Sequence, residues 1–148
     1  MTRFQLSWDP LARLVDEGIE DLMLLNWQET GEGLPFDPDW ERALELEFHG
    51  VLHCLALRDE GRLAGYSGFY VTPHFHSRRL LNAVNDVVFT APWARGAGVR
   101  LVRGAEPKLV ELGAKRIVYH VRTGTTAGDL LAKLGYVHFE SGYSKQMG

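Results

Sequence analysis

Apolar residues recur at helical spacing in two segments near the N-terminus. The first segment starts at residues 9–10, where Asp-Pro supplies an N-cap and a proline at the first helical position, and it ends at Gly31. Its apolar face consists of Leu11, Leu14, Val15, Ile19 and Leu22. A second Asp-Pro start at residues 37–38 opens a helix that Gly50 closes. The apolar face of this second helix consists of Trp40, Ala43, Leu44 and Phe48.

Two apolar and aromatic runs come next and predict a β-hairpin. They cover residues 51–58 and 62–71, and the glycine-containing turn 59–61 joins them. Residues 83–90 form a further apolar run, which predicts a third strand.

The apolar period becomes helical again from Gly98 and stops at Gly113. A short strand is predicted within residues 116–121 and a short helix over residues 126–134. Residues 136–146 predict a last extended segment, too short for two full-length strands. A hairpin followed by a strand–helix–strand unit indicates a mixed sheet with helices on its faces. We therefore expect a mixed α/β fold in which residues 1–148 form a single domain.

Composition supports an ordinary folded domain. The chain has 148 residues, of which 45% are hydrophobic, enough to build a core. We find no apolar run long enough to span a membrane and no apolar leader at the N-terminus. The single cysteine, Cys54, lies in an apolar run and reads as a buried thiol. These features lead us to expect a cytoplasmic protein.

Charge is divided unevenly along the chain. Residues 1–60 hold 14 acidic and 4 basic side chains, and residues 61–148 hold 5 acidic and 12 basic ones. One explanation is that these charges are ordinary solvated surface. The other is that the second part of the chain binds an anion while the first part favours a cation, and the sequence supports the two equally. A basic stripe with interleaved aromatic residues is missing from the sequence, so we do not expect nucleic acid as a partner. Because no apolar run is long enough to span a bilayer, we do not expect a membrane as a partner either. A homodimer is left open.

The most informative segment is the glycine-bearing loop within residues 87–100. A strand runs into a proline-containing turn, and glycines then open a helix. The first N–H groups of a helix have no internal partners, and with the helix dipole they form an anion site suited to a pyrophosphate. Arg95 and Arg100 add positive charge there. The alternative is a strand-to-helix turn that needs its glycines only for geometry.

This loop resembles the coenzyme A motif of the GNAT superfamily of N-acetyltransferases. That motif is a strand, a proline and then Arg/Gln-x-x-Gly-x-Gly/Ala at the start of a long helix. Arg95 and Gly98 match the motif, whereas Arg100 stands where the family has Gly or Ala. The order of elements agrees over nearly the whole chain, and Leu-Gly-Tyr at residues 134–136 is a weaker family mark. Other short segments resemble small bacterial and phage members, namely residues 26–29, 75–76 and 85–86.

The resemblance implies a sheet that splays beside the third strand and acetyl-coenzyme A (acetyl-CoA) as cosubstrate. Pantetheine would pair with the backbone of Val88, Phe89 and Thr90, and an N–H near Phe89 would stabilise the oxyanion. The pyrophosphate would lie on the loop, which consists of Arg95, Gly96, Ala97, Gly98, Val99 and Arg100. The acceptor would be a primary amine of a small molecule or a protein, which attacks the thioester directly.

Four side chains are candidates for proton transfer. Glu29 ends the first helix, where the resemblance places the acceptor, and Asp86 lies among apolar residues of a strand. His76 is a further candidate base. The tyrosine that acts as acid in many family members corresponds here to Leu131, so Tyr136 is a candidate replacement. For each of these residues a purely structural role is the alternative. No cluster of metal ligands is evident, so we expect no metal site.

Two other functions compete with an acetyltransferase. One is a catalytically silent GNAT fold that binds coenzyme A or a protein partner, which the missing tyrosine and Arg100 favour. The other is a binding module whose loop holds a different phosphate. The intact run from Arg95 to Gly98 favours the enzyme.

Overall fold

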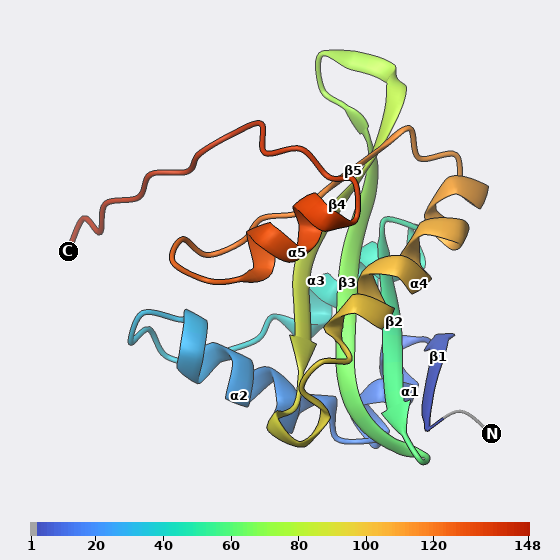
Figure 1. The fold of residues 1–148 in the computed structure, drawn as a ribbon, viewed down its shortest axis with the longest axis vertical. Coiled ribbons are helices and arrows are strands. Elements are labelled where there is room, and N and C mark those ends of the chain that lie inside the picture. The colour runs from blue at the N-terminus through green and yellow to red at the C-terminus, as the bar shows by residue number, and fades with distance from the viewer. Residues whose placement is uncertain (1–2) are drawn as a thin grey trace.

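A five-stranded mixed sheet forms the centre of the molecule (Figure 1). The computed structural model describes residues 3–148. The strands are β1 (Phe4–Trp8), β2 (Leu52–Asp59), β3 (Arg62–His74), β4 (Ser77–Thr90) and β5 (Arg116–Val118), and they lie in this order across the sheet. Neighbours from β1 to β4 are antiparallel, and β5 is parallel to β4. The predicted mixed sheet is therefore confirmed.

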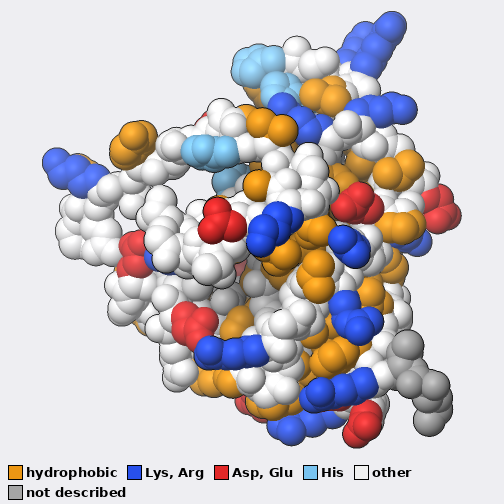
Figure 2. All heavy atoms as spheres, viewed as in Figure 1, with side chains coloured by type: hydrophobic (Ala, Val, Ile, Leu, Met, Phe, Trp, Pro, Cys, Tyr) orange, Lys and Arg blue, Asp and Glu red, His pale blue; other side chains and the backbone are white. Residues whose placement is uncertain are grey.

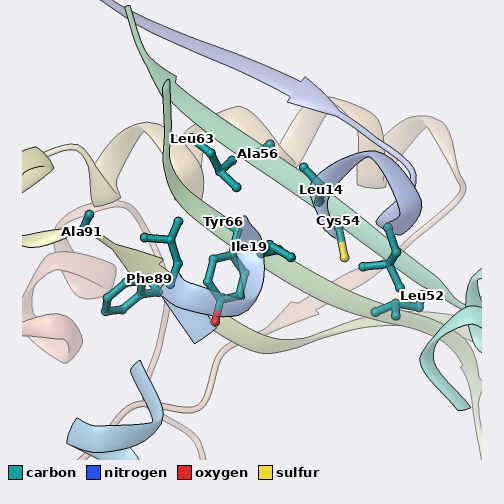
Figure 3. Packing of buried hydrophobic residues seen from close by; sticks show 11 residues of the cluster. Leu14, Ile19, Leu52, Cys54, Ala56, Leu63, Tyr66, Phe89 and Ala91 are labelled. Carbon is teal, nitrogen blue, oxygen red and sulfur yellow. The ribbon is translucent and has the colours of Figure 1, made fainter. Parts of the chain in front are cut away.

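Helices cover both faces of the sheet. They are α1 (Leu11–Asp16), α2 (Ile19–Thr30), α3 (Trp40–Phe48), α4 (Gly98–Glu111) and α5 (Ala127–Lys133). Side chains alternate along each strand, so neighbouring residues of β2 enter different cores. Cys54 and Ala56 pack with α1 and α2, as Figure 3 shows, whereas Leu55 and Leu57 pack with α4. Within residues 3–148, no helix has the length and apolar character that crossing a membrane requires.

The structure differs from the predicted elements in four places. Gly18 adopts φ +88° and divides the first predicted helix into α1 and α2. The N-cap of α3 is Asp39, whose carboxylate accepts a 3.0 Å hydrogen bond from the Arg42 amide, so the helix starts later than the Asp-Pro pair indicates. The strand β1 was not predicted. The extended segment after Tyr136 pairs with no strand in the described part of the chain.

A buried arginine ties β1 and α1 to β2. Arg58 donates to both carboxylate oxygens of Glu17, at 2.7 and 2.8 Å, and to the Ser7 hydroxyl at 2.7 Å. It also lies 2.9 Å from the carboxylate of Asp9, whose side chain is 5% exposed. Burial raises the pKa of Asp9, but hydrogen bonds from Ser7 and Arg58 and the charges of Arg58 and Arg13 outweigh burial and lower it overall. The pKa of Glu17 is lowered chiefly by its hydrogen bonds from Arg58.

Arg58→Met should destabilise the fold by about 3 kcal/mol at pH 7, because it leaves a buried carboxylate without its main partner. The folded-state pKa values of Asp9 and Glu17 lie below their ordinary values of 3.8 and 4.5. Their contribution to stability is therefore complete above about pH 5 and is lost as pH falls through the lowered values. Urea unfolding between about pH 2 and pH 7 should show a steeper acid loss in the wild type than in the variant. Arg3→Met, which removes an exposed ion pair with Asp59, is the control and should change stability little.

Candidate functional site

An opening in the sheet lies between β4 and β5. The two strands pair only at Asn82↔Arg116, Ala83↔Ile117 and Val84↔Val118. β4 continues to Thr90, so among residues 3–148 no strand lies beside residues 85–90 on the β5 side. Their outward backbone groups are free to bind a ligand in the opening.

A β-bulge at Asp86 marks the start of this opening. Gly68 pairs with Val87 and Phe69 pairs with Asn85, which leaves Asp86 as the extra residue on β4. The buried Asn85 amide nitrogen donates to the Ser67 hydroxyl at 3.0 Å and to the carbonyls of Gly68 and Val87 at 3.1 Å. One side chain thus satisfies the polar groups that the bulge leaves unpaired.

Ladder geometry decides which residues of β4 face the opening. The Ala91 amide donates to the Ala64 carbonyl at 2.7 Å, so these residues form a hydrogen-bonded pair. Hydrogen-bonded and non-hydrogen-bonded pairs alternate in an antiparallel ladder, so Phe89 directs its N–H and C=O toward β3. Val88 and Thr90 direct theirs into the opening. The N–H near Phe89 that we expect to act in the site is therefore that of Val88 or Thr90, not that of Phe89 itself.

The Asp86 carboxylate faces the helix-covered side where α2 and α3 pack. Its side chain is accessible to solvent, yet surrounding protein desolvates the carboxyl and raises its pKa above the ordinary 3.8. Its charge in turn adds to the effect of burial in raising the pKa of Tyr66, Tyr70 and Cys54, which line the same face of the sheet. Asn26 of α2 lies beside the Tyr66 hydroxyl and lowers the pKa of that phenol. Asp86 therefore lies close enough to Tyr66, Tyr70 and Cys54 for its charge to act on their side chains.

The loop after β4 exposes backbone N–H groups. Pro92–Ala94 form one turn of 3₁₀ helix, and Gly96 then adopts φ +90°, a conformation that favours glycine. The amides of Gly96, Gly98 and Val99 donate to no backbone carbonyl in the described chain, and no side chain caps α4. A Cβ atom added at Gly96 or Gly98 would meet nothing within 4 Å. The start of α4 is thus an open cradle of N–H groups.

Two arginines of this loop differ in direction. Arg95 is exposed beside the cradle. The Arg100 guanidinium lies 5.3 Å from the centre of the Phe4 ring on β1, so its side chain is directed away from β4. Arg100 can therefore replace the small residue of the motif without filling the cradle.

Two loops meet beside the opening. Arg122, in the segment between β5 and α5, donates to the Thr30 carbonyl at the end of α2 and lies 3.4 Å from the Glu32 carboxylate. The Trp27 indole N–H donates to the Leu34 carbonyl at 2.7 Å and fixes the loop after α2. These contacts join the end of α2 to the segment that follows β5.

The structure separates the four predicted proton-transfer residues. Glu29 lies in the last turn of α2, one turn beyond Asn26, and is exposed. His76 lies at the tip of the β3–β4 hairpin, ten residues before Asp86, which is about 30 Å along an extended strand. His76 and Asp86 are therefore not brought together.

Tyr136 belongs to a cluster on the α4 side of the sheet. Its hydroxyl donates to Glu106 of α4 at 3.3 Å, and its ring packs edge-on against Tyr119. Burial, together with Glu106, raises the pKa of Tyr136 to about 12. The Tyr119 hydroxyl is the one buried side-chain polar atom without a partner in residues 3–148. Tyr119 and His120 directly follow Val118, the last β5 residue that pairs with β4. Neither was predicted as a site residue, because only the register of β5 shows that they lie where the opening begins.

Metal ligands do not converge in this site. In the described part of the chain, no three His, Cys, Asp or Glu side chains are arranged to hold a metal ion.

Comparison with known proteins agrees with this geometry. Residues 19–136 match the sequence profile described as the acetyltransferase (GNAT) family. A ribosomal-protein-alanine N-acetyltransferase from Brucella melitensis biovar Abortus 2308 superposes with TM-score 0.77 at 22% identity, covering 99% of both chains. No curated protein sequence matches this chain significantly.

Two further structures share the fold at lower identity. An aminoglycoside acetyltransferase from an uncultured soil metagenomic sample has TM-score 0.77 at 12% identity, covering 99% of this chain and 97% of the other. Glucosamine-6-phosphate N-acetyltransferase from Arabidopsis thaliana has TM-score 0.69 at 13% identity, covering 99% and 100%.

Asn85→Ala should destabilise the protein by about 2 kcal/mol, because the carbonyls of Gly68 and Val87 and the Ser67 hydroxyl lose a buried donor. Chemical denaturation checks this value. Gln28→Ala, at an exposed position of α2, is the control. Equal small losses in both variants would show that the Asn85 side chain does not stabilise the bulge.

Proposed function

The chain belongs to the acetyltransferase (GNAT) family and is an acetyl-CoA-dependent N-acetyltransferase; we propose that the opening between β4 and β5 is its active site. One observation carries this proposal. The unpaired edge of β4 leads without interruption from the bulge at Asp86 to the free amides at the start of α4. A long, thin ligand with a phosphate group at one end fits such a track. We infer further that residues 1–148 act as one catalytic domain.

The cradle at the start of α4 would hold the pyrophosphate of acetyl-CoA. Gly96, Gly98 and Val99 offer N–H groups with no backbone partner, and the positive end of the helix dipole adds to them. The space above Gly96 and Gly98 admits a group of this size. Arg95 supplies positive charge at the rim, and Ala97 and Arg100 complete the turn, because the Arg100 amide donates to the Ala97 carbonyl at 3.0 Å.

Val88 and Thr90 would pair with the pantetheine amides, since their backbone groups face the opening. We assign to the Val88 N–H the stabilisation of negative charge on the thioester oxygen, an effect of about 3 kcal/mol for one well-placed donor. Phe89 contributes its buried side chain to the core beneath this edge.

Asp86 is our proposed general base. Desolvation raises its pKa, which brings the carboxylate closer to the basicity that proton removal from an amine requires. It lies on the face of the sheet that α2 covers, so an amine entering between α2 and β4 would meet it. Glu29, one turn beyond Asn26 on α2, would attract the amine as a cation. We omit His76 from this site because of its distance.

The leaving thiolate needs no dedicated acid in this proposal. Leu131 replaces the usual tyrosine, and the Tyr136 hydroxyl already donates to Glu106. A thiol of pKa about 8.5 leaves readily as thiolate near neutral pH. The acceptor class remains a primary amine of a small molecule or a protein.

Gly98→Glu should abolish acetyl-CoA binding and leave the fold intact. The new side chain enters open space, so it does not clash with the protein, but it places a negative charge where the phosphates would lie. Isothermal titration measures affinity, and circular dichroism checks the fold. Gly98→Ala is the matched control and should retain most of the affinity. Unchanged affinity in Gly98→Glu would exclude this loop as the phosphate cradle.

Asp86→Asn should lower kcat/KM for the amine by about 100-fold, within the range of general-base catalysis. Glu29→Gln should lower it by about tenfold, mainly through KM, because we assign to Glu29 attraction rather than proton transfer. Acetyl-CoA affinity should stay unchanged in both variants. If Glu29→Gln reduced kcat more than Asp86→Asn did, the roles of the two carboxylates would be reversed. Loss of acetyl-CoA affinity in both would indicate a folding defect.

A further inference from the structure

The β3–β4 hairpin projects beyond the rest of the sheet (Figure 1, top). β2 stops pairing with β3 at Leu52↔Tyr70, and β5 starts pairing with β4 at Asn82↔Arg116. Residues 72–80, which we call the ribbon, therefore have strand neighbours only within the ribbon and its base. A two-stranded ribbon is marginally stable on its own in water. Such a ribbon gains stability when another surface packs against it.

The ribbon presents an aromatic tip with positive charge behind it. The Phe75 side chain is 94% exposed, and its ring meets the His76 ring edge-on with centroids 5.1 Å apart. Arg78 and Arg79 follow and are exposed. Figure 2 shows His and Lys or Arg side chains gathered around the top of the molecule, where the ribbon projects.

The outer face of α3 has the opposite chemistry. Trp40, Ala43 and Leu46 pack against the core, and no residue of this helix is fully buried. The opposite face exposes a stripe of large apolar side chains, because Leu44 is 45% and Phe48 is 85% exposed. Glu41 and Glu45 flank this stripe and are also exposed.

These two surfaces lie at the same end of the sheet. Phe48 ends α3 four residues before Leu52, and Leu52 pairs with Tyr70, just before the ribbon begins. Within residues 3–148, the charges of Arg78, Arg79, Glu41 and Glu45 take part in no ion pair. The described part of the chain thus carries two surfaces whose charges are unpaired, one basic with an aromatic tip and one acidic with an apolar stripe.

We propose that this chain forms a two-fold symmetric dimer in which the ribbon of each copy packs on α3 of the other. Phe75 lies against Leu44 and Phe48 of the second copy, and the positive charge of the ribbon lies near Glu41 and Glu45. A second copy is the occupant because the complement of each surface, in both charge and apolar character, is present on the same chain. A two-fold axis then uses both surfaces twice and leaves neither open.

Analytical ultracentrifugation of the full chain tests the apolar part of the interface. The wild type should sediment as a dimer at micromolar concentration. Phe75→Ser should raise the dimer dissociation constant by about 30-fold or more, the effect of an interface hot spot. Tyr143→Ser is the matched control, since Tyr143 is 97% exposed and lies outside both surfaces, and it should leave the constant unchanged.

Charge reversal tests the pairing of the two surfaces. Arg78→Glu with Arg79→Glu should dissociate the dimer, and so should Glu41→Lys with Glu45→Lys. Mixing the two monomeric variants should restore a dimer, because each ribbon then meets an α3 face of opposite charge. Arg103→Glu with Lys133→Glu, at exposed positions of α4 and α5, should leave the dimer intact.

Several results would overturn the proposal. A monomeric wild type would refute it. If that monomer bound a single-stranded oligonucleotide through the ribbon, the ribbon would be a nucleic-acid surface instead of a dimer interface. A dimer that persists in Phe75→Ser but dissociates in Tyr143→Ser would assign the interface to the C-terminal segment. Two charge-reversed variants that stay monomeric when mixed would show that the ribbon and α3 do not meet.

Discussion

The parallel pairing of β4 with β5 ends after three residue pairs, and the rest of the site depends on that early end. The backbone N–H and C=O groups at the edge of a strand inside a sheet normally form hydrogen bonds with the next strand. Here β4 keeps those groups for a ligand while its other edge stays fully paired with β3. The strand is therefore both rigid and available, which a surface loop cannot be. Rigid placement of donors is what allows them to stabilise charge without reorganisation.

The bulge divides β4 into two parts with different tasks. Before it, the strand belongs to the complete sheet and holds β5 in place. After it, the strand edge faces the opening and leads to the cradle at the start of α4. Asn85 stabilises the bulge, because its side-chain amide donates hydrogen bonds to polar groups beside the extra residue Asp86. The two cores, packed under α1 and α2 on one face and under α4 on the other, keep the divided strand in position.

Local chemistry made the glycine-bearing turn at the start of α4 predictable, whereas long-range pairing decided which other residues lie near it. A proline followed by glycines fixes a strand-to-helix turn within a few residues, so the cradle at Gly98 could be found in the sequence. Asp86 drew attention as a lone carboxylate in an apolar strand, but the bulge that exposes it depends on the register with β3. The same register turns the Phe89 amide away from the opening, and the length of the hairpin removes His76 from it. β1 was missed because its five residues gain their strand character from pairing with β2 and from the buried Arg58.

The single cysteine has a practical consequence for measuring the reaction. Cys54 lies within the core beneath α1 (Figure 3), and burial, with the nearby carboxylates of Glu47 and Asp86, raises the pKa of its thiol to about 12. Only thiolates react quickly with disulfide or maleimide reagents. The folded enzyme is therefore silent toward such reagents near neutral pH, and any colour they develop during turnover counts the coenzyme A released. In a sample without acetyl-CoA, a slow rise in reactive thiol would report unfolding of the protein itself, so one reagent reads both catalysis and the integrity of the core.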